Sequence, residues 1–318
     1  MSVSPSYVPQ GVIPACLLPF NDDLSIDEHN FRRHLNELAD TPGLSAITVN
    51  GHSTEVAACS INEQKRILDI ALDEVGNRIP IVNGIFNEST LEAAETARWS
   101  QKAGASALLA APPSIFRDGA QYRPAMAFSH YGTIAEASDL PIILFQFQMA
   151  SGLGFSLDTQ IELADRIPTI QATKDACGDP VMFERTVRAL QGRDKPVHVL
   201  TTHTAWLFQS LVVGCNGLLS GAGSTIAGLQ VALFDAIRAN DLAKARAVQE
   251  RIWPITEAFY ANPFVDMHNR MKEAQVLLGR LPSATVRPPL VKLGQTEIER
   301  IHNALSMAGM IEKTANVA

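Results

Sequence analysis

The sequence lacks the features that mark membrane proteins and nucleic-acid-binding proteins. None of its 318 residues lies in a run of the about eighteen consecutive apolar residues that a membrane helix needs. Residues 1–10 have no basic segment followed by an apolar one, so we see no signal peptide. The net charge is −7, whereas a nucleic-acid surface needs a basic patch. We therefore expect a cytoplasmic protein with no membrane or nucleic-acid partner.

Cysteine is scarce, and the usual metal, nucleotide and hydrolase motifs are missing. The four cysteines form no CxxC pair and lie in or beside apolar segments, which predicts buried free thiols in a reducing compartment (Cys16, Cys59, Cys177 and Cys215). The eight histidines include no HExxH, and the chain has neither G-x-S-x-G nor GxGxxG. We therefore predict neither a bound metal nor a cofactor.

Short apolar runs alternate with helical patterns along the first 225 or so residues. Eight runs are apolar on both faces, as strands of a covered parallel sheet are: 11–18, 44–50, 79–85, 105–111, 140–147, 170–174, 197–202 and 217–220. Between them, apolar residues recur at helical spacing. This alternation predicts a (β/α)₈ TIM barrel; an open doubly wound sheet is the alternative, but no nucleotide-binding turn supports it.

Capping motifs predict where several helices begin. The segments Ser25-Ile-Asp-Glu28, Ser60-Ile-Asn-Glu63 and Ser89-Thr-Leu-Glu92 all fit the capping box, and Asp179-Pro180 gives a fourth start. After residue 227, four further helical patterns follow without a Gly/Ser linker. We therefore predict a barrel over residues 1–227 and a C-terminal helical extension over 228–318 that packs onto it as one structural unit.

Lys174 is the strongest candidate for a catalytic residue. Active sites of such barrels lie at the C-terminal ends of the strands, and Lys174 closes the sixth predicted strand. Strand alternation puts it on the same side as Ala172, toward the barrel interior. Burial lowers the pKa of a lysine, and a neutral amine can attack a ketone to form an imine. A surface or ion-paired lysine is the alternative.

Two strand-end turns could contact a ligand. Gly51-His52-Ser53-Thr54 offers hydroxyls and backbone N–H groups suited to a carboxylate, although an ordinary capped turn has the same composition. Gly221-Ala222-Gly223 could let the backbone approach a ligand, or could form a tight turn only.

Several segments, taken in order, carry a family resemblance. They are Gly51-His-Ser-Thr-Glu55, Leu140-Pro-Ile-Ile-Leu144, Thr173-Lys174, Gly217-Leu-Leu-Ser220, Met271-Lys272 and Arg287-Pro-Pro-Leu290. Together the sequence resembles the dihydrodipicolinate synthase / N-acetylneuraminate lyase superfamily. The resemblance implies a homotetramer, a Schiff base between Lys174 and a small 2-oxo acid, and a substrate carboxylate held by Ser53 and its turn. It also implies that the substrate contacts the following residues: Thr54, Phe145, Gln146, Leu219, Ser220 and Gly221.

The departures from the family pattern limit the reaction. Phe145 stands where the family has a proton-relaying tyrosine, Gln146 replaces its asparagine neighbour, and Ala150 aligns with an arginine of the synthases. These losses make dihydrodipicolinate synthesis an unlikely activity. Because histidine titrates near neutral pH, His52 and His203 are the candidates for the missing proton relay; both could instead only cap turns.

Two functions follow from this reading. The first is a lyase that dehydrates or cleaves a 2-oxo-3-deoxy sugar acid, or a related pyruvate-yielding substrate, through the imine on Lys174. The second is a barrel that has lost catalysis and binds a 2-oxo acid as a sensor or scaffold.

Overall fold

Eight parallel strands form a barrel in the computed structural model, which describes residues 7–202 and 206–312. Neighbouring strands pair in the order β1-β8-β7-β6-β5-β4-β3-β2. Parallel bridges from Val12 to Leu44 and from Ala15 to Thr48 join the first and second strands and close the barrel. The strands are β1 Gly11–Pro14, β2 Ile47–Val49, β3 Ile81–Ile85, β4 Ala107–Ala110, β5 Ile142–Gln146, β6 Ile170–Asp175, β7 His198–Thr201 and β8 Gly217–Ser220. The predicted TIM barrel is confirmed.

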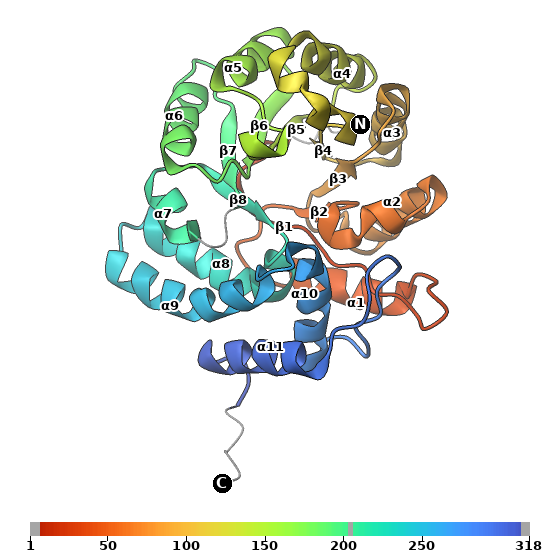
Figure 1. Cartoon of the computed structure of the whole chain (residues 1–318), viewed down its shortest axis with the longest axis vertical. Helices are drawn as coiled ribbons and strands as arrows, with labels where there is room; N and C mark the ends of the chain where they lie inside the picture. Colours follow the sequence, from red (N-terminus) through yellow and green to blue (C-terminus); the bar gives the residue numbers. More distant parts are fainter. Residues whose placement is uncertain (1–6, 203–205, 313–318) are drawn as a thin grey trace.

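A ring of helices surrounds the strands (Figure 1). Its members are α1 Glu28–Ala39, α2 Ile61–Val75, α3 Thr90–Ala103, α4 Ala125–Glu136, α5 Leu157–Arg166, α6 Pro180–Gln191, α7 Leu207–Val212 and α8 Gly223–Arg238. Short 3₁₀ turns follow several strands: η1 His52–Thr54, η2 Val56–Ala58, η3 Ser114–Asp118, η4 Ala120–Tyr122 and η5 Met149–Ser151. None of the helices in the described ranges is long and apolar enough to cross a membrane.

The capping motifs predict the starts of α2 and α6 correctly, but not the start of α1. Ser60 and Glu63 form the predicted reciprocal capping box, and Asp179 accepts the N–H groups of two residues in the first turn of α6. Helix α1, however, begins at Glu28 and is capped by Asp27, not by Ser25. The backbone N–H and the hydroxyl of Ser25 are both bound to the carboxylate of Asp23, so this serine closes a loop three residues before the helix.

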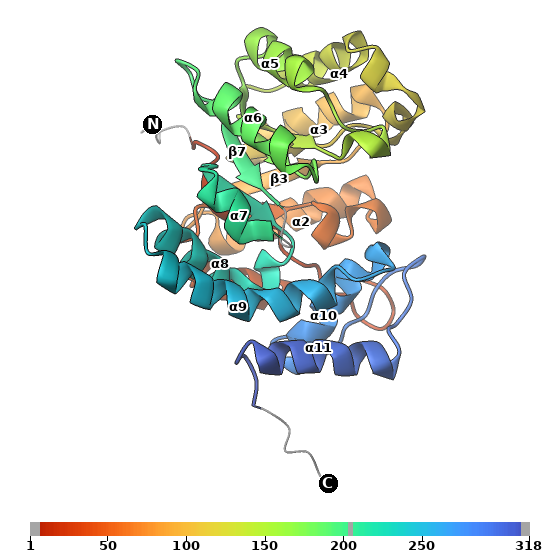
Figure 2. The same cartoon turned by 60° about the vertical axis from the view of Figure 1, so that its left-hand side comes forward.

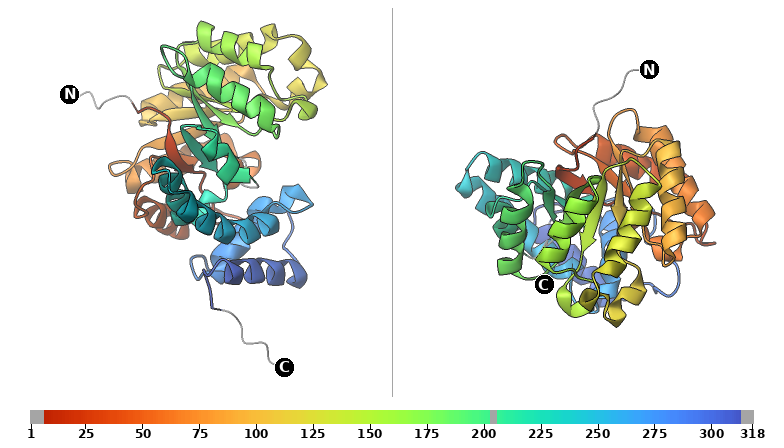
Figure 3. Two further views of the ribbon diagram at one scale, coloured as in Figure 1. Left: turned by 90° about the vertical axis from the view of Figure 1, so that its left-hand side faces the viewer. Right: turned by 90° about the horizontal axis from the view of Figure 1, so that it is seen from above.

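The C-terminal extension consists of α9 Leu242–Phe259, η7 Phe264–Asp266, α10 Met267–Leu277 and α11 Gln295–Met307. Helix α9 packs on α8, and α11 packs on α9 and α10. Figures 2 and 3 show these helices as a layer on the side of the barrel that carries α1 and α8. The predicted boundary at residue 227 falls inside α8, next to Ile226, whose backbone is not helical (φ −119°, ψ 31°).

The barrel interior is apolar below the ends of the strands. Inward-facing side chains from several strands form one buried cluster, among them Ile13, Val82, Leu109, Ile143, Ala172 and Leu219. This packed layer fills the barrel interior, as in other barrels of this kind, and a cavity lies above it at the C-terminal mouth.

Candidate active site

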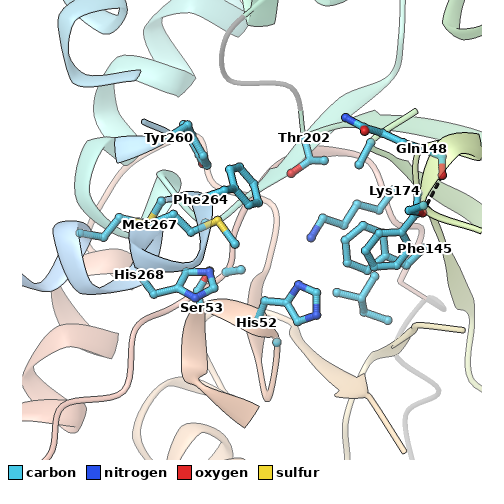
Figure 4. A pocket seen from close by; sticks show the side chains of 18 of the residues that line it. His52, Ser53, Phe145, Gln148, Lys174, Thr202, Tyr260, Phe264, Met267 and His268 are labelled. Atoms are coloured by element: carbon cyan, nitrogen blue, oxygen red, sulfur yellow. Dashed lines mark hydrogen bonds between the residues drawn. The ribbon is translucent and has the colours of Figure 1, made fainter. Parts of the chain in front are cut away.

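A cavity of about 600 Å³ opens at the C-terminal ends of the strands. Barrel residues line one side of it and residues of the C-terminal extension line the other (Figure 4). The lining residues are Ala15, Gly51, His52, Ser53, Leu109, Arg117, Phe145, Phe147, Gln148, Ser151, Lys174, Ala176, Thr202, Gly221, Tyr260, Phe264, Met267, His268 and Met271.

Lys174 projects into this cavity from the end of β6 (Figure 4). Its neighbour two residues earlier, Ala172, belongs to the interior cluster, so the predicted strand alternation holds. The side chain is 7% exposed, and its Nζ lies 3.9 Å from the ring centroid of Phe145. Burial lowers the pKa of Lys174 to about 7. Within residues 7–202 and 206–312, Lys174 has no hydrogen bond or ion pair, which leaves its amine available to a ligand.

The turn after β2 places Ser53 beside the strand-eight turn. Ser53 lines the cavity and is 3% exposed. A Cβ atom on Gly221 would lie 2.5 Å from the hydroxyl oxygen of Ser53, so a side chain there would displace the serine. Glycine at this position therefore lets the two turns meet at the cavity floor.

His52 lies among aromatic rings. Its ring centroid is 4.6 Å from that of Phe86, 5.7 Å from that of Phe145 and 6.1 Å from that of Phe147. The side chain of His52 is exposed to the cavity, and the neighbouring rings cover part of its surface. This partial removal from water, together with the charge of Lys174, lowers the pKa of His52. The imidazole is therefore neutral at pH 7, and its pKa of about 3 makes it a weaker proton acceptor than an ordinary histidine.

The other side of the cavity comes from α9, η7 and α10. Five of their side chains line it: Tyr260, Phe264, Met267, His268 and Met271. His268 is 8% exposed, and burial followed by the charges of His52, Lys174 and Lys272 lowers its pKa to about 3. The sequence carries no signal for this side, because helical periodicity does not tell which helix lies over the mouth of a barrel.

A buried ion pair fixes the extension to the turn after β2. Lys272 of α10 donates from Nζ to the carboxylate of Glu55 and, at 2.9 Å, to the carbonyl of Thr285. The second carboxylate oxygen of Glu55 accepts the backbone N–H of Arg287 at 3.1 Å. The Phe20 ring lies 4.3 Å from both cationic groups. Lys272 and Arg287, which belong to the two C-terminal segments with the family resemblance, thus fix the extension to the barrel beside the cavity.

A sequence model of the Dihydrodipicolinate synthetase family matches residues 8–308. The chain belongs to this family. It is 28% identical over 305 residues to the 4-hydroxy-tetrahydrodipicolinate synthase of Methanopyrus kandleri, an alignment that covers 95% of this chain and 97% of the relative. The synthase of Haloarcula marismortui is 29% identical over 298 residues, with 93% and 92% covered.

Solved structures of the dihydrodipicolinate synthetase family share the fold. YagE, a prophage protein of this family from E. coli K12 solved in complex with pyruvate, has a TM-score of 0.87 at 24% identity, over 95% of this chain and 99% of YagE. A dihydrodipicolinate synthase variant described as monomeric has a TM-score of 0.86 at 22% identity, over 98% and 100%. At these identities, the likeness establishes the fold alone.

Four of the predicted substrate contacts do not line the cavity. Gln146 follows the inward-facing Phe145 and therefore points outward, where its amide exchanges hydrogen bonds of 2.9 and 3.0 Å with the backbone of Phe155. Leu219 faces inward but lies in the packed interior cluster. Ser220 accepts a hydrogen bond from the Gln230 side chain at 3.2 Å.

The fourth is Thr54, whose hydroxyl serves the turn itself. Its Oγ1 accepts the N–H of Gly51 at 3.2 Å and donates to the carbonyl of Cys16 at 3.2 Å. His203, the second predicted relay residue, lies outside the described residues. The remaining predicted residues converge at one mouth as expected: His52, Ser53, Phe145, Lys174 and Gly221.

The cysteines are buried and unpaired, as predicted. Burial raises the pKa of Cys16 to about 12 and that of Cys59 to about 11, so these thiols stay protonated at neutral pH. No group of three or more potential metal ligands occurs in the part of the chain that the structure describes.

Proposed function

We propose that this chain is a lyase that binds a 2-oxo acid as an imine on Lys174. The main support for this proposal is the environment of the Lys174 amine at the mouth of the barrel. The amine is buried, has no hydrogen-bond or ion-pair partner within the described residues, and has its pKa lowered to about 7. About half of such amines are uncharged at neutral pH and can act as nucleophiles. Membership of the dihydrodipicolinate synthetase family supports this assignment.

The proposed reaction begins with attack of the Lys174 amine on C2 of the 2-oxo acid. Water leaves, and the iminium that remains withdraws electrons from C3. Loss of a proton from C3 gives an enamine that keeps the whole substrate chain. In a 4-hydroxy acid, a base can instead remove the proton of the 4-hydroxyl group; the C3–C4 bond then breaks, an aldehyde is released, and the enamine of pyruvate remains on Lys174. Protonation at C3 and hydrolysis of the imine return pyruvate and the free lysine. Dehydration instead expels a hydroxyl group from the substrate chain.

Ser53 is the proposed anchor for the substrate carboxylate. Its hydroxyl lines the cavity and has no hydrogen-bond partner within residues 7–202 and 206–312. His52 is the proposed proton relay, because its imidazole is exposed in the same cavity as Lys174. His203 stays a second candidate on the strength of its position in the sequence.

The substrate differs, in our proposal, from that of the synthases named among the relatives. Phe145 has no hydroxyl to exchange protons, and Ala150 cannot bind a second carboxylate as an arginine does. We propose dehydration or retro-aldol cleavage of a 2-oxo acid in place of dihydrodipicolinate synthesis.

A catalytically impaired barrel that senses a 2-oxo acid is the second candidate function. The phenyl ring of Phe145, only 3.9 Å from the Lys174 Nζ, favours it, because no hydroxyl is available there to transfer protons. A sensor would bind its ligand without exchanging the protons at C3.

The test is reductive trapping of the imine. Incubation with pyruvate and borohydride should add the mass of the reduced pyruvate adduct to the peptide that carries Lys174. Lys174→Ala should give no adduct while its thermal unfolding remains cooperative. An adduct on a different lysine, or none with the parent protein, would contradict the proposed function.

The assembly and the compartment are also proposals. The family resemblance supports a homotetramer in the cytoplasm, although one structural neighbour is described as monomeric. Light scattering on the purified full chain would decide the oligomeric state.

A further inference from the structure

Two apolar walls face each other across the cavity. The first, which we term the strand wall, consists of Phe145 and Phe147, whose rings stack at 4.0 Å with an angle of 22° between their planes. The second, the helix wall, consists of Phe264, Met267 and Met271. Figure 4 shows Phe264 and Met267 on the opposite side of the cavity from Lys174 and Phe145.

The helix wall offers apolar surface that a ligand could cover. Phe264 is 55% exposed although it lines the cavity, and its ring stacks on Tyr260 at 5.9 Å with an interplanar angle of 28°. Covering an aromatic ring with another flat apolar group removes both surfaces from water and adds a favourable ring contact.

The two walls themselves consist of apolar side chains, and the polar side chains that line the cavity lie around them: His52, Ser53, Arg117, Gln148, Ser151, Lys174, Thr202, Tyr260 and His268. Lys174 and Ser53 are assigned to the carbonyl and the carboxylate of the substrate. The hydroxyl of Ser151 already donates to the carbonyl of Gln148 at 2.6 Å, and Arg117 is exposed. Phenylalanine and methionine side chains offer a hydroxyl group no N–H or O–H donor, so a polyhydroxylated chain lying against the two walls would leave water without new hydrogen-bond partners there.

We propose that the substrate is a 2-oxo acid whose C4 carries a flat apolar substituent, such as an aryl ring, held between the strand wall and the helix wall. This inference rests on the proposed function. It narrows the proposed substrates from 2-oxo acids in general to 2-oxo acids that carry an aryl or similar apolar group. The carboxylate then lies toward Ser53, the C2 carbon at Lys174, and the ring between Phe147 and Phe264.

The test compares three 2-oxo acids in the borohydride reaction: pyruvate, 2-oxo-4-phenylbutanoate and a six-carbon 2-oxo-3-deoxy sugar acid. The concentration that gives half-maximal adduct on Lys174 should be at least about tenfold lower for the phenyl compound than for the sugar acid. A ratio below this, or the reverse order, overturns the inference. Absence of an adduct with all three, pyruvate included, would instead contradict the proposed function.

A variant of the helix wall separates side-chain recognition from general damage. Phe264→Asn should reduce the preference for the phenyl compound over the sugar acid by about tenfold. Val265→Asn is the matched control, because Val265 lies in the same turn, is 62% exposed and does not line the cavity. Its preference should equal that of the parent protein. Unchanged preference in Phe264→Asn, or an equal loss in both variants, would refute the role of the helix wall.

Discussion

The two sides of the cavity differ in the kind of side chain they contribute. The barrel side carries the amine of Lys174, the hydroxyl of Ser53 and the imidazole of His52. The extension side carries two aromatic rings, two methionines and His268. In our proposal, the end of β6 and the turn after β2 hold the groups that react, whereas the helices that follow the barrel shape the space beyond them.

This division explains how one fold can accept different substrates with the same intermediate. In the proposed mechanism, the imine needs an amine at the end of β6 and an anchor for the carboxylate, and both candidates, Lys174 and Ser53, lie on the barrel side. The group beyond C3 meets η7 and α10 instead. Changes in the extension can thus alter the substrate without disturbing Lys174, provided that the extension stays fixed to the barrel through Glu55 and Lys272.

The largest expected effect concerns the barrel side alone. If the residues at the strand ends determine which reaction is catalysed, this chain should not condense pyruvate with aspartate semialdehyde, because Phe145 and Ala150 replace the tyrosine and the arginine of the synthases. Expression of the chain in a strain that cannot make diaminopimelate should give no growth without the supplement. A relative named as the synthase, expressed alongside, should restore growth. Robust growth with this chain would show that the strand-five departures do not limit the reaction.

The next prediction compares one histidine from each side. His52→Asn should slow hydrogen–deuterium exchange at C3 of pyruvate by about 10²–10⁴-fold, because proton transfer in the imine needs a general base. His268→Asn should slow it by less than about tenfold, since we assign the extension to shape and not to proton transfer. Proton NMR of pyruvate in deuterated buffer measures both rates.

Borohydride trapping is the control for these two variants. Both should still give the adduct at long times, which shows that the amine is intact. A larger loss in His268→Asn than in His52→Asn would transfer the relay to the extension side. Parent-like exchange in both would leave His203, water or the substrate carboxylate as the relay.

The barrel was predictable because its signals are local. Apolar runs of strand length, capping residues such as Ser60 and the alternation that turns Lys174 inward each depend on neighbours within a few residues. Each predicted run overlaps one observed strand, although the run at 11–18 outlasts its strand, which ends at Pro14. Helices α1 and α2 bury apolar residues at helical spacing, as the pattern between the first three runs predicts.

The rest of the site was not predictable because it depends on distant contacts. Gln146 and Phe145 are adjacent, and only the barrel geometry shows which of them faces the cavity. Thr54 lies in a turn whose sequence suits ligand binding, but its hydroxyl donates a hydrogen bond to the carbonyl of Cys16, 38 residues away. His268 and Phe264 reach the mouth through long-range contacts of the extension: α9 and α10 pack on α8, and Lys272 pairs with Glu55, 217 residues earlier in the chain.

A third prediction tests that connection between the two sides. Lys272→Met should lower the free energy of unfolding by about 3–5 kcal/mol, because it leaves the Glu55 carboxylate buried without its cation. Urea titration followed by tryptophan fluorescence measures the loss. Lys292→Met, at an exposed lysine of the same region, should change it by less than about 0.5 kcal/mol.

The double variant Glu55→Gln/Lys272→Met sharpens this test. Removing both charges should restore much of the lost stability, since no isolated buried charge remains. If the double variant is as unstable as Lys272→Met, packing of the lysine stem and not its charge fixes the extension to the barrel.

The smallest expected effect is the pH dependence of imine formation on the barrel side. Only the neutral amine of Lys174 attacks the ketone, and burial has lowered its pKa from 10.5 to about 7. The rate of imine formation with pyruvate should therefore fall about tenfold per pH unit below about pH 7 and level off above about pH 8. An ordinary lysine would instead gain rate up to about pH 10. Quenching samples with borohydride after short incubations at each pH, always into the same quench buffer, measures the adduct without altering the reduction step. A rate that still rises between about pH 8 and 10 would mean that the cavity leaves Lys174 charged at neutral pH, and that the apolar surroundings contributed by both sides do not activate it.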